Sequence, residues 1–192
     1  FNNTDQNYFT VGIPRLEKLK KQNINKVYKD TVLINLNFTF NVLTEYSNSW
    51  ISEVIQACEE LNLQYKITKH PDDKTEVDEN YITFEQIYDG INNSSIVISR
   101  FSTVIIEALA LGKPVVYHNP GFEKVEKFKD SLGAYSISSN IDQLKKAIIF
   151  EMEQEDIRLR ANNFLQLHAN INFDSLENTK NAIIKILDKD ER

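Results

Sequence analysis

The 192-residue sequence contains a single cysteine, Cys58, which excludes a disulfide framework and a zinc site built from several cysteines. Glycine and proline are also scarce, with five and four residues, so a low-complexity or disordered chain is not expected. No stretch approaches the roughly 18 to 20 apolar residues of a membrane-spanning helix, and no signal peptide is visible. We therefore expect a folded cytoplasmic protein, with peripheral contact at the inner face of the cell membrane as its closest approach to lipid.

Positive charge is in the minority, with 22 Lys and Arg against 28 Asp and Glu and a net charge of −6. A protein that binds nucleic acid mainly through electrostatic interactions needs a clustered basic surface that displaces counterions from the phosphates. The charge therefore argues against nucleic acid as a partner. It still permits a small anionic ligand that is bound locally.

Several familiar site motifs are absent, including G-x-G-x-x-G, G-x-x-x-x-G-K-[ST] and G-x-S-x-G, so dinucleotide oxidoreductases, P-loop proteins and α/β-hydrolases lose their main support. His118 and His168 have no metal-ligating neighbours at a suitable spacing. The acidic run at 72–79 does not have the spacing of an EF-hand loop and is interpreted as a solvated connection. We therefore predict no metal site and no cofactor.

Short apolar segments alternate with amphipathic helical segments over most of the chain, and past Pro120 the pattern becomes mostly helical, apart from a short strand in AYSIS. Strands that are nearly all apolar and separated by helices indicate a parallel sheet covered on both faces. The sequence thus predicts an α/β fold, a Rossmann-like doubly wound parallel sheet with C-terminal helices. The predicted strands are 31–38, 64–68, 81–84, 95–99 and 113–118.

Polar residues follow the predicted strands, at the edge where open α/β sheets bind their ligands. They are Asn37, Thr39 and Asn41 at the end of the first strand, Lys69 and His70, followed by Pro71, after the second, Arg100, Ser102 and Thr103 after the fourth, and His118 and Asn119 at the end of the fifth.

Ser102 and Thr103 stand where a strand turns into a helix, and a helix N-terminus offers unpaired N–H groups and a positive dipole end to a phosphate. Each exposed charge interaction of this kind is worth only about 0.3 to 1 kcal/mol, so several donors must act together. His70 at the end of the second strand is a candidate for neutralising or donating to the same phosphate. The alternative is that Ser102 only caps its helix.

Glu107 is the only charged residue in a helix otherwise made of apolar and small residues, where an unpaired buried carboxylate is costly. A ribose diol is a fitting partner, because its two hydroxyl donors match the two carboxylate oxygens. The alternatives are an internal salt bridge to Arg100 or Lys113, or exposure at the edge of the helix.

Four segments carry a resemblance to a known family. The stretch SRFSTVIIEALALGKPVVYHNPG resembles the motif region in the C-terminal, donor-binding half of glycosyltransferases with the GT-B fold. VGIPRLEKL resembles the segment that links the two halves, VLINLNFTFN resembles the first strand of the donor half, and KHP resembles its His-Pro signature. The similarity spans nearly the whole chain and is closest to bacterial surface and capsular carbohydrate biosynthesis proteins, relatives of CDP-glycerol glycerophosphotransferases.

The resemblance implies that His70, Ser102 and Thr103 contact the donor phosphates and that Glu107 binds the ribose. The further candidates for donor contacts are Asn37, Thr39, Lys69 and Arg100. It also implies a linker at 1–28, a nucleotide-sugar-binding domain at 29–150, and C-terminal helices at 151–192 that pack on this domain or on a separate N-terminal half. A polysaccharide or lipid-linked acceptor would bind that other half, together with the catalytic base, so no catalytic residue is assigned.

We therefore expect the donor-binding half of a glycosyltransferase that transfers a sugar or polyol phosphate from a nucleotide-activated donor in bacterial surface polysaccharide biosynthesis. Two alternatives remain. A nucleotide-sugar 2-epimerase shares the fold and similar motifs, and a non-catalytic nucleotide-sugar-binding domain would carry the same site.

Overall fold

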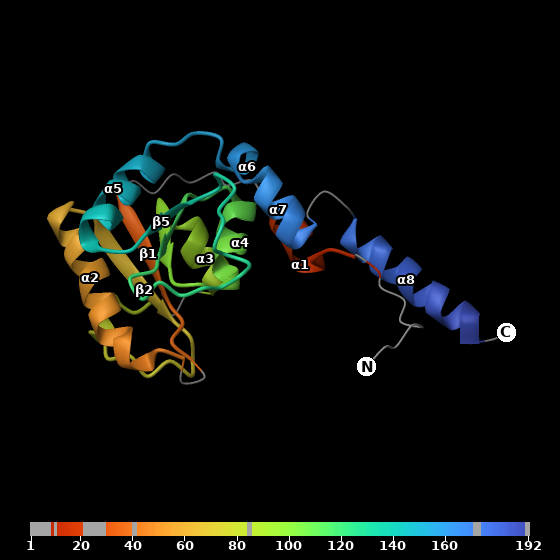
Figure 1. Ribbon diagram of the computed structural model, residues 1–192, viewed down its shortest axis with the longest axis horizontal. Helices are drawn as coiled ribbons and strands as arrows, with labels where there is room; N and C mark the ends of the chain where they lie inside the picture. The colour runs from red at the N-terminus through yellow and green to blue at the C-terminus, as the bar shows by residue number, and fades with distance from the viewer. Residues whose placement is uncertain are drawn as a thin grey trace.

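A computed structural model describes residues 9, 11–20, 30–39, 42–83, 86–170 and 174–190. Its strands are β1 (Thr31–Leu36), β2 (Gln64–Lys69), β3 (Ile96–Ser99), β4 (Val115–His118) and β5 (Ser136–Ser138). These strands form one parallel sheet in the order β2-β1-β3-β4-β5 (Figure 1). The predicted doubly wound α/β fold is confirmed, and its order reverses between β1 and β3.

Helices connect the strands and extend the chain beyond them. They are α1 (Pro14–Lys20), α2 (Ser47–Glu60), α3 (Ile87–Asn92), α4 (Thr103–Leu111), α5 (Ile141–Met152), α6 (Ile157–Arg160), α7 (Asn162–Ala169) and α8 (Ser175–Asp190), with 3-10 turns η1 (Thr44–Tyr46) and η2 (Glu79–Tyr81).

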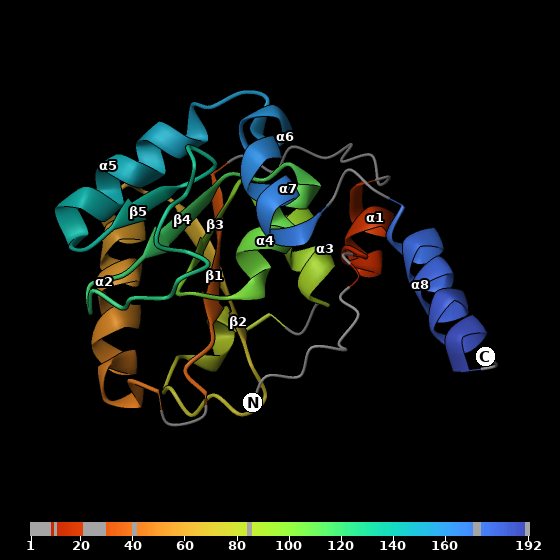
Figure 2. The ribbon, with the colours of Figure 1, turned by 45° about the vertical axis from the view of Figure 1, so that its right-hand side comes forward.

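The sheet is covered on both faces because side chains of a strand alternate between them. In β1, Val32 and Ile34 are buried in the cluster that includes α2 and α5. Leu33 points to the other cluster, which includes α1, α3, α4, α6 and α7. Figure 2 shows these two helical layers on either side of the sheet. The strands are apolar along nearly their whole length because both of their faces pack against a hydrophobic core.

One predicted strand is wrong. Tyr81 ends the turn η2, and only Ile82 forms a bridge, to Ile67 of β2, while Phe84 lies outside the described residues. The Asp78 side chain accepts a hydrogen bond from the backbone N–H of Asn80 at 2.9 Å and winds the chain into the turn. The fifth strand is instead β5, the short strand predicted in AYSIS.

The ends of α4 are set by local residues. Ser102 has an extended backbone, and its Oγ accepts from the N–H of Val104 at 3.3 Å, which is the expected N-cap. Gly112 ends the helix in the left-handed region at φ 79°, a conformation that glycine adopts readily. The eight residues from Val104 to Leu111 are buried, so α4 is the central helix of its layer.

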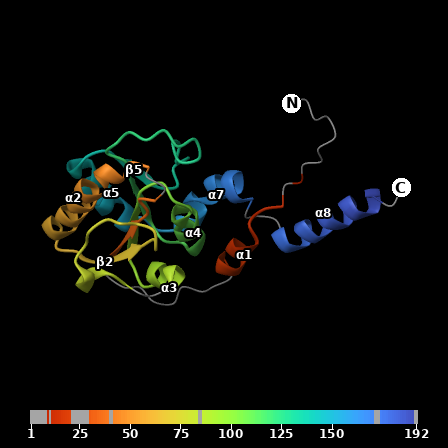
Figure 3. The same ribbon diagram turned by 90° about the horizontal axis from the view of Figure 1, so that it is seen from below.

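The helix α1 links the sheet domain to α8. Leu16 and Leu19 of α1 are buried in the same cluster as α4. Glu17 accepts a hydrogen bond from the backbone N–H of Ser175 at the start of α8. From there α8 extends away from the sheet, as Figure 3 shows. Among the described residues, no helix is long and apolar enough to cross a membrane.

Candidate functional site

A cavity of about 530 Å³ opens at the carboxyl ends of β1, β2 and β3. It lies at the reversal of strand order between β1 and β3, where open α/β sheets hold their ligands. All eight predicted site residues line it, namely Asn37, Thr39, Lys69, His70, Arg100, Ser102, Thr103 and Glu107. Asn41, which the sequence also pointed to, lies outside the described residues.

The first turn of α4 forms one wall of this cavity. Thr103 is exposed there, and Glu107 stands one turn further along the same face, at the i, i+4 spacing. Capping uses one lone pair of the Ser102 hydroxyl, whose O–H remains able to donate to a ligand. The cap and the phosphate contact are therefore compatible roles for Ser102.

Glu107 is buried, with 7% of its side chain exposed, and its partner is Arg15 of α1. Arg15 Nη2 lies 2.8 Å from Glu107 Oε1, and the Tyr88 hydroxyl also hydrogen-bonds the carboxylate. Burial raises the pKa of Glu107, while Arg15 and Tyr88 lower it. The salt bridge considered from the sequence thus exists, but its cation comes from the segment interpreted as a linker.

The two cations considered in that alternative, Arg100 and Lys113, are engaged elsewhere and do not pair with Glu107. Lys113 Nζ donates to the carbonyl oxygens of Asn92 at 2.9 Å and Ser94 at 2.6 Å. The buried ammonium thereby satisfies carbonyl groups at the C-terminal end of α3. Arg100 is buried and paired with Glu123, with Nε 2.6 Å from Oε1. Arg100 therefore lines the cavity with its charge already compensated.

Lys69, the last residue of β2, and His70, which follows it, form another wall of the cavity. The His70 side chain is 44% exposed, and its Nδ1 accepts from the backbone N–H of Asp72 at 3.2 Å. In the neutral imidazole that bond leaves the proton on Nε2, which can donate to a ligand. Lys69 Nζ donates to the carbonyl oxygen of Thr75 at 2.6 Å, which ties the following loop to β2.

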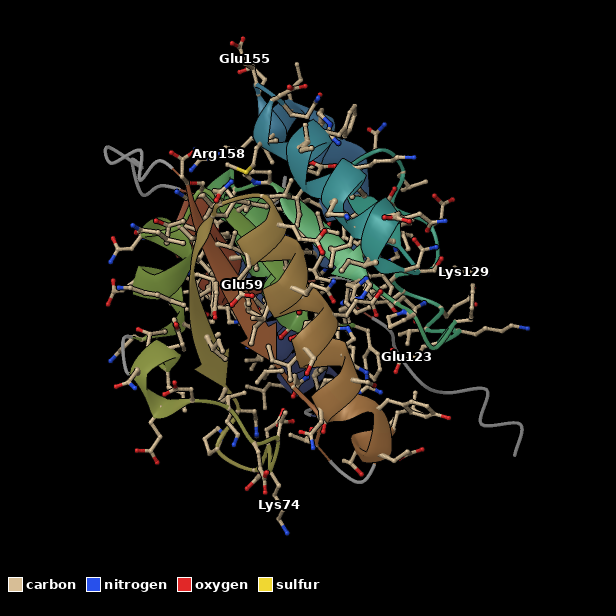
Figure 4. The ribbon with its side chains drawn as sticks, turned by 90° about the vertical axis from the view of Figure 1, so that its left-hand side faces the viewer. Glu59, Lys74, Glu123, Lys129, Glu155 and Arg158 are labelled. Atoms are coloured by element: carbon tan, nitrogen blue, oxygen red, sulfur yellow. The ribbon has the colours of Figure 1, made fainter. Side chains whose placement is uncertain are left out.

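Asp73 shapes the site, although the sequence analysis placed it in a solvated run. It is buried, and its Oδ2 accepts from the backbone N–H of Phe38 at 2.6 Å. Its Oδ1 accepts from the backbone N–H of Thr75 at 2.8 Å. The neighbouring Lys74 points outward at the edge of the molecule in Figure 4. An Asp two residues before a Thr is a frequent turn pattern, and this pattern is the feature of the sequence that indicates a structural role for Asp73.

Asn37 and Thr39 follow β1, and the backbone between them is fixed by the hydrogen bond that the N–H of Phe38 donates to Asp73. The Thr39 hydroxyl donates to Asn37 Oδ1 at 3.4 Å, a long contact that a ligand can replace. Both side chains therefore present polar atoms to the cavity from a backbone that is held in place.

His118 and Asn119 are not part of this cavity and line a much smaller hollow of about 20 Å³. His118 is fully buried, with Nδ1 2.9 Å from Ser138 Oγ and Nε2 3.5 Å from Glu53 Oε2. Burial lowers the pKa of His118 to about 4. His168 packs on the Phe164 ring at 4.5 Å between centroids. Within the part of the chain that the structure describes, no group of three or more His, Cys, Asp or Glu could hold a metal ion.

No protein-family model and no curated protein sequence matches the chain. Solved structures do match it in fold. The wall teichoic acid polymerase TagF is 14% identical with a TM-score of 0.54, and the match covers 92% of this chain and 48% of that one. The UDP-GlcNAc 2-epimerase of Methanocaldococcus jannaschii is 14% identical with a TM-score of 0.54, covering 83% and 54%. S. aureus TarM is 15% identical with a TM-score of 0.50, covering 83% and 37%.

At sequence identities of 14% to 15%, these comparisons show the fold alone. The chain has the Rossmann-like α/β fold of one half of a GT-B structure, as the resemblance implied. It spans about half the length of the polymerase and the epimerase that it matches.

Proposed function

We propose that the chain is the donor-binding half of a glycosyltransferase and that its cavity holds a nucleotide-activated donor. The observation that supports this most strongly is the convergence at one cavity of a helix N-terminus, hydroxyl groups and a buried carboxylate. At about 530 Å³, the cavity falls within the roughly 300 to 1,000 Å³ of small-molecule sites.

The donor phosphates would lie at the N-terminus of α4. Its backbone N–H groups and the hydroxyls of Ser102 and Thr103 are donors, and His70, which lines the same cavity from the loop after β2, would donate through Nε2. Preorganised donors stabilise a charge without reorganisation, so no metal is required. Asn37, Thr39 and Lys69 line the rest of the cavity. Arg100 also lines it, with its charge paired to Glu123.

The ribose hydroxyls would donate to Glu107. A carboxylate has two oxygens and about four lone-pair sites, so the bonds from Arg15 and Tyr88 leave capacity for a diol. The domain organisation that we propose is a linker at 1–28, the nucleotide-binding domain at 29–150 and C-terminal helices at 151–192 that pack on this domain or on a separate N-terminal half. The acceptor, a polysaccharide or lipid-linked chain, would be bound by that half.

The pathway we propose is surface polysaccharide biosynthesis in bacteria. It is supported by the similar folds of a wall teichoic acid polymerase, described with CDPG soaked in, and of TarM, described with UDP. A nucleotide-sugar 2-epimerase is the second candidate, because an epimerase described with UDP-GlcNAc and UDP has an equally similar fold. Product analysis with the full-length protein separates transfer to an acceptor from epimerisation of the donor.

Nucleotide binding tests the proposal directly. Calorimetric titration with CMP, CDP, UDP and GDP should reveal a saturable ligand, and Glu107→Ala should weaken it by at least about 10-fold because a buried charge-assisted hydrogen-bond acceptor is lost. Glu155→Ala is the matched control, since Glu155 is exposed and lies at the far end of the molecule from Lys74 of the site loop (Figure 4). Equal affinity of both variants for every nucleotide would contradict the assignment.

A further inference from the structure

The carboxylate of Glu107 lies between the cavity and a cation from a distant part of the chain. Arg15 pairs with Glu107 Oε1, and Tyr88 of α3 hydrogen-bonds the same carboxylate. Glu107 is among the residues that line the cavity, whereas Arg15 and Tyr88 are not. Both groups therefore contact the carboxylate without themselves lining the cavity.

Arg15 is presented by a helix that is fixed at several points. Leu16, its neighbour in α1, is 1% exposed, and Leu19 is 3% exposed, both in the cluster that contains α4. Glu17 is bonded to the backbone of Ser175 at the start of α8. The Arg15 side chain is itself 54% exposed, so its position depends on this anchored backbone and on the ion pair.

The charges around Glu107 make Arg15 consequential. Burial raises the pKa of Glu107, and Arg15 opposes this effect more than Tyr88 does. Lys127 adds positive charge close to Arg15, and the cations Lys69 and Arg100 line the cavity but are bonded to Thr75 and to Glu123. An uncharged residue at position 15 would leave the buried carboxylate without its paired cation.

We propose that Arg15 is a positioning residue of the donor site, anchoring the Glu107 carboxylate so that its remaining lone pairs are presented to the ribose hydroxyls. This inference rests on the proposed function for its ligand. It assigns a role in the binding site to the segment that the sequence analysis treated as a linker.

The effect of Arg15 on Glu107 is measurable without any ligand. The ¹³C resonance of the Glu107 carboxyl would be titrated in the unsubstituted protein and in Arg15→Met, which keeps an apolar stem. We expect the Glu107 pKa to rise further in Arg15→Met, because the opposing cation is lost, and to be largely restored in Arg15→Lys. Lys146→Met, which removes an exposed cation of α5, should leave it unchanged. An unchanged Glu107 pKa in Arg15→Met overturns the inference.

Nucleotide affinity then separates positioning from a merely structural role. For the nucleotide that binds the unsubstituted protein, Arg15→Met should lose at least about 10-fold in affinity, and Arg15→Lys, which restores a cation at this position, should recover much of it. An equal loss in Arg15→Met and Arg15→Lys overturns the inference, because the cation at position 15 would then not be what sustains binding. If the unsubstituted protein binds no nucleotide, the proposed function fails, while the carboxyl titration still decides whether Arg15 controls Glu107.

Discussion

Arg100 and Glu123 form a buried ion pair between the loops that follow β3 and β4. The guanidinium carbon of Arg100 lies 4.4 Å from the centroid of the Phe38 ring and 4.5 Å from that of Phe101. Only 3% of the Arg100 side chain and 9% of the Glu123 side chain are exposed. The pair joins the floor of the cavity to the neighbouring loop, where Figure 4 shows Glu123.

Removing one partner of this pair should destabilise the fold strongly. We expect Glu123→Ala to lower the free energy of unfolding by about 3 to 5 kcal/mol, because the Arg100 guanidinium would be left buried without its counter-charge. Glu126→Ala is the control from the same loop, since Glu126 is 87% exposed and its pair with Lys129 should be worth less than about 1 kcal/mol. Urea unfolding of both variants checks this, and equal costs would contradict the role of the buried pair.

The pH dependence of the free energy of unfolding should reflect the protonation of His118. Its pKa is lowered by burial to about 4, whereas in the unfolded chain it binds a proton below about pH 6.5. Between these values the unfolded state binds more protons, so the contribution of His118 to stability is present above about pH 6.5 and is lost as the pH falls toward 4. The largest slope from one such group is roughly 1.4 kcal/mol per pH unit.

Chemical denaturation at a series of pH values measures this slope. In the His118→Gln variant, the free energy of unfolding should depend less steeply on pH over that range. Glu53, whose pKa is raised by burial, is present in both proteins, so its contribution is common to both profiles. His70→Gln serves as the comparison, because the His70 side chain is 44% exposed. A profile that is equally steep in His118→Gln would show that other groups cause the acid sensitivity.

The contact between Gly12 and α8 should be specific to glycine. Gly12 has φ +82°, and a Cβ there would lie 2.5 Å from Ser175 Oγ and 3.2 Å from the Asn170 carbonyl oxygen. Gly133 has a similar φ of +77° with nothing within 4 Å, so Gly133→Ala should cost only the backbone preference of about 1 to 2 kcal/mol. Gly12→Ala should cost more and should increase amide hydrogen exchange in α8. Equal costs would mean that α8 is not held at this contact.

Ser102→Asp separates the capping role of Ser102 from its proposed role at a phosphate. Asp is about as good an N-cap as Ser, so the free energy of unfolding should change by less than about 0.5 kcal/mol. The added negative charge beside the proposed phosphate site should weaken nucleotide binding by at least about 10-fold. If calorimetry shows unchanged affinity in a stable Ser102→Asp protein, Ser102 is only a helix cap.

The sheet and the gathering of the site residues were predictable because both depend on local patterns. Apolar strands separated by helices indicate a parallel sheet, and the carboxyl ends of its strands meet at one edge, which brings His70, Ser102 and Glu107 together. The strand expected at 81–84 failed because the Asp78 turn and the stacking of Tyr81 on Tyr65, at 4.6 Å between centroids, outweigh its apolar pattern.

The partners of the buried charges could not be predicted in the same way. The two buried pairs at the site join residues far apart in the sequence, and from the sequence alone several cations are possible partners for each carboxylate. The Arg15–Glu107 pair depends on how α1 packs on α4, and the Arg100–Glu123 pair depends on the loop after β4. Asp73 looked like one member of an acidic run until its bond to Phe38 was seen.

Locating a bound nucleotide diphosphate by NMR tests the central claim most directly. In a titration of the ¹⁵N-labelled protein, we predict that the largest amide shifts occur at Thr103 and Val104, where the α4 N–H groups would meet the phosphates. Smaller shifts should occur at Thr39 and His70, and the amide of Glu155 should not move. Shifts centred away from the cavity, or none at saturating nucleotide, would contradict the account.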